Sequence, residues 1–264
     1  MKPRQKTCLA VAGFDPSGGA GIIADIKTFA AFGCRSTAAI TSITFQNSDG
    51  VFGFVHQTPE SICKQLEGIF NEFEVAAVKI GMVPTEELVT ELTTILRAQN
   101  VKNIVIDPII RSSSGVDLID DQAIDAMLSE LFPLATIVTP NIPEAERLTG
   151  IEIKNKGDIS SAARHPHSLG VENVLIKGGH FETDSSTARD FLFTGHELTV
   201  LETQRIPNVS VRGTGCMLSS AIAANLAHGK ELIEAVRVAK DFVREAIMTE
   251  KEFKIETHTS SAES

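Results

Sequence analysis

The segment Gly213-Thr214-Gly215-Cys216 combines two glycines with a thiol at the start of a predicted helix over Thr214–Ala227. Free backbone amides at a helix start, together with the helix dipole, bind anions and suit a phosphoryl group during transfer. The same position is expected to lower the pKa of Cys216, which could then act as a base. Taken alone, the segment also fits a plain glycine-rich turn with a buried cysteine.

A second glycine-rich segment, Gly13 to Gly21, nearly matches a nucleotide-binding P-loop. The lysine and the Ser/Thr of a P-loop are replaced by Gly19 and Ala20, which argues against a Walker-type ATPase. The glycines still let the backbone approach a ligand closely. Asp25 follows in the next predicted helix, where its carboxylate could bind a substrate amine or complement the helix dipole.

Acidic, amide and basic side chains also follow three apolar runs. Asp107 ends one run, Asn141 and Glu144 follow another, and Lys177 ends a third. Carboxylate and amide oxygens suit Mg²⁺ or its waters beside a nucleotide, and a lysine suits a phosphate. Each residue has a simpler reading as well, because turns, helix starts and solvated lysines use the same residue types.

The elements that must position these residues alternate between short β-branched runs and longer stretches of helical period. This alternation predicts an α/β fold with a mostly parallel central sheet and helices on both faces. The predicted strands are Cys8–Phe14, Thr37–Phe45, Ala76–Met82, Asn103–Ile109, Thr136–Thr139 and Asn173–Lys177. The predicted helices between them are Ile22–Phe32, Pro59–Asn71, Thr85–Gln99, Asp121–Leu131, Pro143–Leu148 and Ser160–Ser168.

The C-terminal third changes pattern. Asp190–Phe193 and Glu197–Thr203 predict an antiparallel hairpin at one edge of the sheet. Two further helices, Thr214–Ala227 and Glu231–Glu250, are separated by a glycine that suits a helix C-terminus. Because ligands of open α/β sheets bind outside the carboxyl ends of the strands, the polar clusters that follow the strands are expected to form one rim.

Composition excludes several classes of partner. The 264-residue chain carries a formal net charge of −10, which argues against nucleic acid and anionic membranes. No apolar run approaches the length of a membrane span. The four cysteines show no zinc-like spacing, and the histidines show no ligand pattern, so no structural metal is expected. A reducing cytoplasm fits this cysteine usage.

Five segments together resemble the ribokinase-like superfamily, specifically its hydroxymethylpyrimidine/phosphomethylpyrimidine kinase branch of thiamine biosynthesis. The segments are Ala12–Thr28, Lys79–Met82, Val138–Glu146, Lys177–His180 and Gly213–Cys216. The resemblance implies a single kinase domain over residues 1–256, followed by a tail at 257–264 that is expected to be disordered. It also implies that ATP and Mg²⁺ are used, and that the protein is a homodimer.

The resemblance assigns roles to individual residues. It makes Gly213, Thr214, Gly215 and Cys216 the catalytic anion hole, in which Cys216 replaces the aspartate base of sugar kinases. Asp25 and Gln46 are implied to pair with an aminopyrimidine, between walls made by Gly13, Phe45 and Met82. Asp107, Asn141, Lys177 and Thr214 are implied to contact ATP, and Glu144 and Asp107 to hold Mg²⁺. The implied reaction phosphorylates the hydroxymethyl group and then the resulting monophosphate.

The chain departs from the family pattern at several positions. Ile23 stands where glutamine is frequent, Phe45 replaces a small residue, and Arg212 stands where a histidine usually precedes the anion hole. The glycine-rich C-terminal segment common in the family is also absent. Arg212 adds a cation that could favour an anionic substrate.

Three alternatives remain at this point. A pyridoxal kinase shares the fold and can carry a cysteine in the same turn, although Gln46-Asn47 favours the pyrimidine. A sugar kinase fits less well because Cys216 is not aspartate. A non-enzymatic nucleotide sensor would bind ligand without releasing ADP.

Overall fold

A computed structural model describes residues 5–112, 115–179, 186–207, 209 and 211–260, with side chains described up to residue 250. Nine strands in this part of the chain form one sheet in the order β3-β2-β1-β4-β5-β6-β7-β8-β9. The strands are β1 Thr7–Phe14, β2 Arg35–Gln46, β3 Val51–His56, β4 Val75–Ile80, β5 Ile104–Ile106, β6 Ile137–Val138, β7 Asn173–Lys177, β8 Thr187–Phe193 and β9 Leu198–Gln204. The central strands β2, β1, β4, β5, β6 and β7 run parallel, whereas β3, β8 and β9 are antiparallel to their neighbours.

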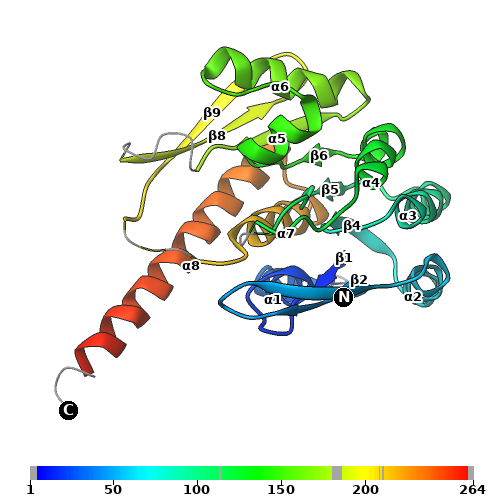
Figure 1. Cartoon of the computed structure of the whole chain (residues 1–264), viewed down its shortest axis with the longest axis horizontal. Coiled ribbons are helices and arrows are strands. Elements are labelled where there is room, and N and C mark those ends of the chain that lie inside the picture. Colours follow the sequence, from blue (N-terminus) through cyan, green and yellow to red (C-terminus); the bar gives the residue numbers. More distant parts are fainter. Residues whose placement is uncertain (1–4, 113–114, 180–185, 208, 210, 261–264) are drawn as a thin grey trace.

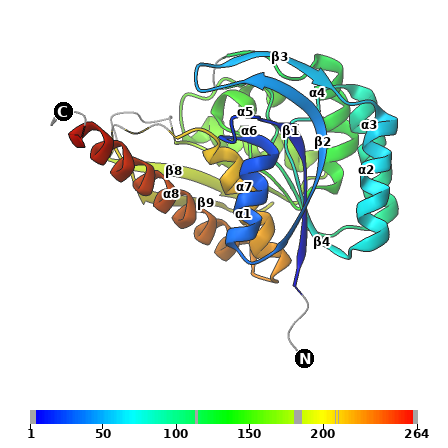
Figure 2. The ribbon, with the colours of Figure 1, turned by 90° about the horizontal axis from the view of Figure 1, so that it is seen from below.

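Helices cover both faces of the sheet (Figure 1). The helical segments are α1 Gly21–Ala31, α2 Pro59–Glu72, α3 Glu86–Gln99, α4 Asp121–Ala126, a π-helix Met127–Leu131, a 3₁₀ turn Phe132–Leu134, α5 Ile142–Thr149, α6 Lys156–Ser168, α7 Thr214–Ala227 and α8 Leu232–Ser260. On one face α1, α7 and α8 pack together, and α2 to α6 cover the other (Figure 2). The predicted α/β fold with helices on both faces is confirmed.

Strand β1 shows why both faces are covered. Its side chains are almost entirely buried, and they alternate between two separate cores. Cys8, Ala10 and Ala12 pack under α1, α7 and α8, whereas Leu9 and Val11 pack under α2 and α3. A strand that is buried on both sides reads as a continuous apolar run, and the sequence shows such a run here.

Local sequence signals set the helix starts. Thr58 caps α2 by accepting a hydrogen bond from the Ser61 amide at 3.2 Å, with Pro59 at the first helical position. Asn141 and Glu144 form a reciprocal capping box at the start of α5. The α5 box matters for function because both of its side chains face the site described below.

Strand β3 was missed by the sequence prediction. It pairs antiparallel with β2 at the edge of the sheet, with Gly53 opposite Phe45. Gly53 interrupts the apolar pattern, and a glycine inside a short run weakens the strand signal. An added Cβ at Gly53 would lie 2.9 Å from the Phe45 ring, so the glycine makes room for that ring within the strand pair.

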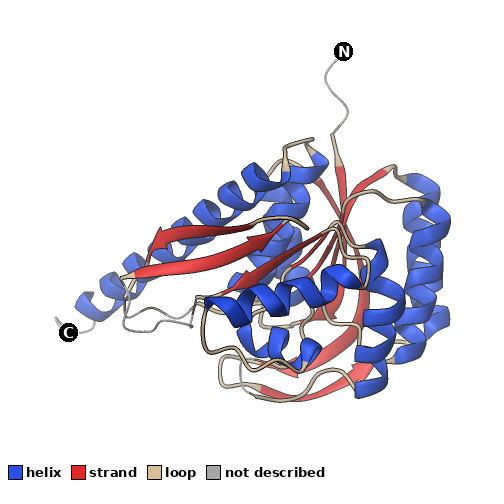
Figure 3. Ribbon diagram, turned by 90° about the horizontal axis from the view of Figure 1, so that it is seen from above, coloured by secondary structure: helices blue, strands red, loops and turns tan. Residues whose placement is uncertain are grey.

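The C-terminal elements form an arm on the molecule. Helix α8 extends beside the β8–β9 ribbon, away from the fan of central strands (Figure 3). The predicted hairpin is confirmed, with both strands beginning or ending a few residues from the expected positions. The expected tail at 257–264 overlaps the end of α8, and residues 261–264 lie outside the described part of the chain. None of the described helices is long and apolar enough to cross a membrane.

Candidate active site

A cavity of about 190 Å³ opens at the carboxyl ends of the central strands and the start of α7. This is the location that the rule for open α/β sheets predicts. The predicted site residues that line it are Gly13, Gln46, Met82, Asp107, Asn141, Glu144, Lys177, Gly213, Gly215 and Cys216. Asp25, Phe45 and Thr214 do not line it. The rim expected from the sequence is therefore one continuous site.

The turn before α7 is held by a close backbone contact. Gly213 has a left-handed φ of 76°, and a Cβ at this position would lie 2.1 Å from the carbonyl oxygen of Gly19. Only glycine allows the turn to touch the Gly13–Gly21 loop in this way. The first bond of the helix runs from the Met217 amide to the Gly213 carbonyl, which leaves the preceding helical amides without an intrahelical acceptor. These amides give the turn its capacity to bind an anion.

Cys216 lies in this turn with 5% of its surface exposed. Burial raises the pKa of its thiol to about 11, and the nearby Asp25 and Asp107 carboxylates add to that rise. Lys79 and the Gly21 amide act in the opposite direction without cancelling it. The expectation of a lowered pKa is therefore wrong, because desolvation outweighs the effect of the helix start.

Asp107 and Lys177 form a largely buried ion pair that lies against Gly215 in the turn before α7. Their Oδ1 and Nζ atoms are 2.6 Å apart, and the Thr139 hydroxyl donates to the same carboxylate oxygen at 3.2 Å. Burial disfavours the Asp107 carboxylate, but Lys177 and Lys79 outweigh burial and hold its pKa below the usual value. A Cβ on Gly215 would lie 3.2 Å from the Lys177 ammonium, so the lysine lies directly against the anion-binding turn.

Asn141 and Glu144 extend the site along the start of α5. The Asn141 side chain accepts from the Glu144 amide at 2.9 Å, and the Glu144 carboxylate accepts from the Asn141 amide at 2.8 Å. Burial raises the pKa of Glu144 to about 7, and Asp107 contributes while Lys177 opposes. The described residues contain no cluster of three or more His, Cys, Asp or Glu side chains arranged for a metal. Asp107 and Glu144 fit Mg²⁺ only if phosphate and water oxygens supply its other ligands, which is how Mg²⁺ commonly binds beside nucleotides.

The other end of the cavity is lined by Gly13, Met82 and Gln46, as expected. A Cβ on Gly13 would lie 3.2 Å from the Met82 sulfur, so the glycine lets the strand end approach that side chain. The Gln46 amide nitrogen donates to Asp15 Oδ2 at 3.3 Å, and its oxygen accepts from the Thr44 hydroxyl at 3.2 Å. The wall therefore offers an apolar thioether and an amide to a planar ring.

Two expected substrate contacts are not present in the structure. Asp25 is fully buried, where its carboxylate pairs with Lys79 at 2.9 Å and accepts from the Ser220 hydroxyl at 2.8 Å. Phe45 is 51% exposed, because alternation along β2 turns Thr44 and Gln46 toward the cavity and Phe45 away from it. The expected pairing of Asp25 with the aminopyrimidine and the expected place of Phe45 in the pocket wall are corrected on these grounds.

Sequence reasoning gave no role to Asp15, Thr44 or Arg111, although all three line the cavity. Asp15 organises the loop that contacts the anion-binding turn, because its carboxylate accepts from the Ser17 amide at 2.9 Å and the Ala20 amide at 3.0 Å. An aspartate followed by Pro-Ser-Gly is a turn signal that could have indicated this role. Arg111 lies in the segment after β5, where no sequence pattern pointed to the cavity.

Fold and site together define a phosphotransferase of the ribokinase-like class. The chain belongs to the phosphomethylpyrimidine kinase family, whose sequence profile matches residues 15–261. It is 40% identical over 243 residues to the hydroxymethylpyrimidine/phosphomethylpyrimidine kinase of Aquifex aeolicus, covering 92% of this chain and 94% of that protein.

Solved structures agree with this assignment. The chain is similar to the phosphomethylpyrimidine kinase of Clostridium difficile, with 42% identity, a TM-score of 0.80, and coverage of 92% of this chain and 100% of that one. It also resembles the pyridoxal kinase of Staphylococcus aureus solved with AMP-PCP and pyridoxal, with 33% identity, a TM-score of 0.83, and coverage of 92% and 88%. The fold alone therefore fits both kinds of vitamin kinase.

Proposed function

We propose that this protein transfers the γ-phosphoryl group of ATP to 4-amino-5-hydroxymethyl-2-methylpyrimidine and then to the resulting monophosphate, forming the pyrophosphate for thiamine biosynthesis. The observation that carries the proposal is the single cavity in which Gln46 and Met82 lie at one end and Lys177 at the other, with the α7 turn between them. Relatives with this activity in their names are about 40% identical over nearly the whole chain.

The cavity divides into two halves. In the acceptor half, the Gln46 amide contacts the heteroaromatic ring, and the hydroxymethyl group lies near Cys216. In the nucleotide half, Lys177 and Asn141 contact ATP. Glu144 and Asp107 would hold Mg²⁺ together with phosphate and water oxygens, and the bound ion would supply positive charge to the phosphates. Catalysis then depends mainly on position and charge, as in other phosphoryl transfers.

A single assay tests this function. Purified protein is mixed with Mg-ATP and, separately, hydroxymethylpyrimidine, its monophosphate, pyridoxal or ribose, and ADP release is followed. We expect ADP with the two pyrimidines. Absence of ADP with every acceptor would reject a kinase and leave a nucleotide-binding sensor.

Pyridoxal kinase is the second candidate, because solved pyridoxal kinases match the fold at TM-scores of 0.81 to 0.83. Gln46 favours the pyrimidine, since an amide can pair with a ring nitrogen and an exocyclic amine together. ADP release with pyridoxal alone would transfer the assignment to this candidate.

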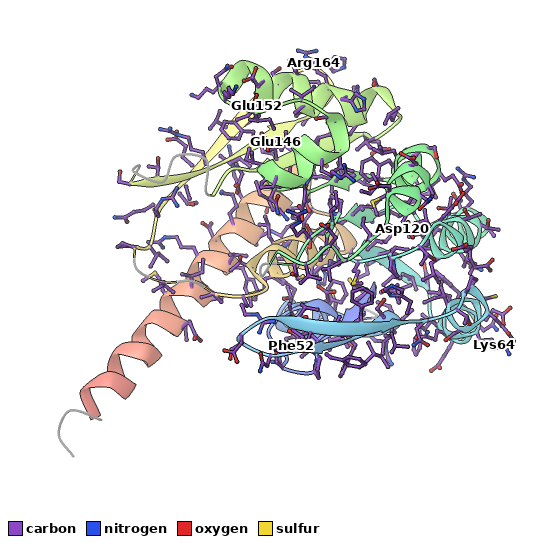
Figure 4. All side chains as sticks on the ribbon, viewed as in Figure 1. Phe52, Lys64, Asp120, Glu146, Glu152 and Arg164 are labelled. Carbon is purple, nitrogen blue, oxygen red and sulfur yellow. The ribbon has the colours of Figure 1, made fainter. Side chains whose placement is uncertain are left out.

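The homodimer is also part of the proposal. Large apolar side chains are exposed on the edge strand pair: Phe45 is 51%, Phe52 68% and Val55 53% exposed. Phe52 lies on β3 at the outer side of the molecule (Figure 4). An apolar surface on an open sheet edge supports self-association. Light scattering after size exclusion measures the oligomeric state directly, and a monomeric mass at micromolar concentration would reject the dimer.

A further inference from the structure

We infer that Arg212 recognises the phosphate of the second acceptor, the phosphomonoester, and so determines whether the site can carry out the second transfer. The inference rests on the proposed function. It concerns a residue that lines the cavity and immediately precedes the anion-binding turn.

Arg212 is held across two loops by three hydrogen bonds. Its Nη1 donates to the Asn47 carbonyl at 2.5 Å and to the Ser17 hydroxyl at 3.4 Å, and its Nη2 donates to Asp15 Oδ2 at 3.3 Å. A guanidinium has five N–H donors. Two of them, Nε–H and one on Nη2, therefore have no partner among the described residues. The group is fixed in position and retains donors for a ligand.

Arg212 forms an ion pair with Asp15, but this contact is longer than most of the other hydrogen bonds of the Asp15 carboxylate. The Ser17 amide and hydroxyl and the Ala20 amide all donate to this carboxylate at 2.7–3.0 Å, closer than Arg212 at 3.3 Å. Gln46 donates to the same Oδ2 atom as Arg212. Asp15 thus places the Arg212 guanidinium next to the Gln46 amide, which is proposed to contact the pyrimidine ring on the acceptor side of the turn.

The second transfer needs a cation at this position. In it, an oxygen of the acceptor phosphate attacks the γ-phosphorus, a new P–O bond forms, and the bond to the bridging oxygen breaks to release ADP. The attacking phosphate must lie where the hydroxymethyl oxygen lay, beside the α7 turn. Two phosphate groups then approach each other, and their repulsion has to be offset by positive charge.

Two other cations at the cavity are held in shorter ion pairs than Arg212, whose Nη2 lies 3.3 Å from Asp15 Oδ2. Lys177 is paired with Asp107 at 2.6 Å on the nucleotide side. Arg111 is paired with Asp117 at 2.7 Å, and its side chain is 62% exposed. Arg212, with 27% of its side chain exposed, is better shielded from solvent than Arg111 and lies beside the turn. Guanidinium is also the side chain that matches phosphate with two parallel donors.

The test compares both transfers in the same variants. Arg212→Gln is expected to lower kcat/KM for the monophosphate by roughly 10- to 100-fold more than for the alcohol, the range for losing charge-assisted hydrogen bonds. Arg212→Lys keeps the charge and is expected to recover part of the loss. Arg111→Gln removes a guanidinium from the same cavity and is the matched control, for which the ratio of the two kcat/KM values should not change.

Direct binding gives a second readout. Calorimetric titration with the monophosphate is expected to show weaker binding in Arg212→Gln, with a smaller dependence on salt, while binding of the alcohol is unchanged. Equal losses for both acceptors, or a changed ratio in Arg111→Gln alone, would overturn the inference while leaving the proposed function intact. If the unmodified protein releases no ADP with either pyrimidine, the proposed function fails instead. Thermal unfolding shows whether each variant is folded. If Arg212→Gln does not fold, the kcat/KM values of the two transfers are compared in Arg212→Lys instead.

Discussion

In the proposed reaction the acceptor alcohol loses a proton near the thiol of Cys216, whose environment favours the protonated form. With a pKa of about 11, only a small fraction of the thiol is ionised near neutral pH. If the thiolate is the base, the rate of the first transfer must follow that fraction. The phosphate acceptor of the second transfer carries an ionised oxygen and needs no base.

Cys216→Ala is therefore expected to affect the two transfers differently. Turnover of the alcohol should fall by roughly 100-fold or more, the usual contribution of a general base. Turnover of the monophosphate should fall much less, and nucleotide affinity should stay nearly unchanged. In the unmodified protein, kcat for the alcohol should rise with pH from 7 toward 10, and this rise should be lost in the variant. A flat pH profile in the unmodified protein would reduce Cys216 to a packing role.

Residue types at strand ends were predictable, but the direction of each side chain was not. The sequence placed Gln46, Asp107 and Lys177 at the rim because strand ends are visible as the ends of apolar runs. Asp25 lies within a helix, where a difference of one position along the sequence decides whether a side chain faces the ligand site or the core. Its partner Lys79 lies inside a buried strand, and no periodicity shows that two such charges meet.

At the scale of elements, the buried ion pair of Lys79 and Asp25 connects a strand and two helices. Lys79 on β4 contacts both carboxylate oxygens of Asp25 on α1, and Ser220 on α7 completes the carboxylate's hydrogen bonds. Both charged side chains have no exposed surface. Burial works against the charge of Lys79, but the Asp25 carboxylate, with Cys216 and Asp107, outweighs it and raises the pKa of Lys79. Burial also raises the pKa of Asp25, and Lys79 and Ser220 oppose that rise. The pair therefore fixes α1 and α7 relative to the sheet directly under the site.

Lys79→Met is expected to destabilise the protein strongly, because it leaves the Asp25 carboxylate buried without a counter-charge. Breaking a buried pair in this way costs about 3–5 kcal/mol. The double variant Lys79→Met, Asp25→Leu should recover much of the loss. Urea unfolding measures both. Lys64→Met is the matched control, because Lys64 pairs with Glu60 on the surface of α2 and both side chains are at least 70% exposed. This control should change the free energy of unfolding little. Equal losses for Lys79→Met and Lys64→Met would contradict a structural role for the buried pair.

The contact between the α7 turn and the glycine loop is a second element-scale feature. Gly213→Ala is expected to lower stability and to abolish turnover, because the new Cβ would collide with the Gly19 backbone oxygen. Gly33→Ala is the control, since Gly33 also has a left-handed φ of 72° but nothing lies within 4 Å of its added Cβ. Both variants carry the cost of about 1–2 kcal/mol for a left-handed alanine. Urea unfolding and ADP release are measured for both variants. Any loss in Gly213→Ala beyond that in Gly33→Ala is the effect of the contact with the Gly19 oxygen. Equal losses in the two variants would mean that the loop and the turn are not tightly coupled.

At the scale of the whole molecule, an acidic protein places cationic side chains around the cavity at one end of the sheet. The net charge is −10, yet Lys177 and Arg212 both line the cavity. The sequence predicted the two helical layers and this rim, because both follow from the period of the apolar residues. It missed the edge strand β3, whose short apolar run is interrupted by Gly53.

Global stability should also depend on pH through Glu144. Its folded pKa of about 7 lies above the ordinary value of 4.5, so the folded state holds a proton that the unfolded chain releases first. The stability from this group is fully present below pH 4.5 and is lost as pH rises through about 7. Glu144→Gln keeps an acceptor for the Asn141 amide and removes the titration. In metal-free buffer without nucleotide, the variant should match the unmodified protein near pH 4.5 and exceed its free energy of unfolding by roughly 1–3 kcal/mol at pH 8.

The same substitution should reduce turnover, because Glu144 is proposed to hold Mg²⁺. Glu146→Gln is the control on the same helix (Figure 4). The Glu146 carboxylate also accepts a backbone amide, that of Ile153 at 2.8 Å, but Glu146 does not line the cavity. Urea unfolding at several pH values and ADP release measure the two effects separately. A Glu144→Gln variant that is less stable than the unmodified protein at pH 8 would show that the ionised carboxylate supports the fold. A variant that is more stable and less active would mean that the site keeps a buried acid for turnover at the expense of stability.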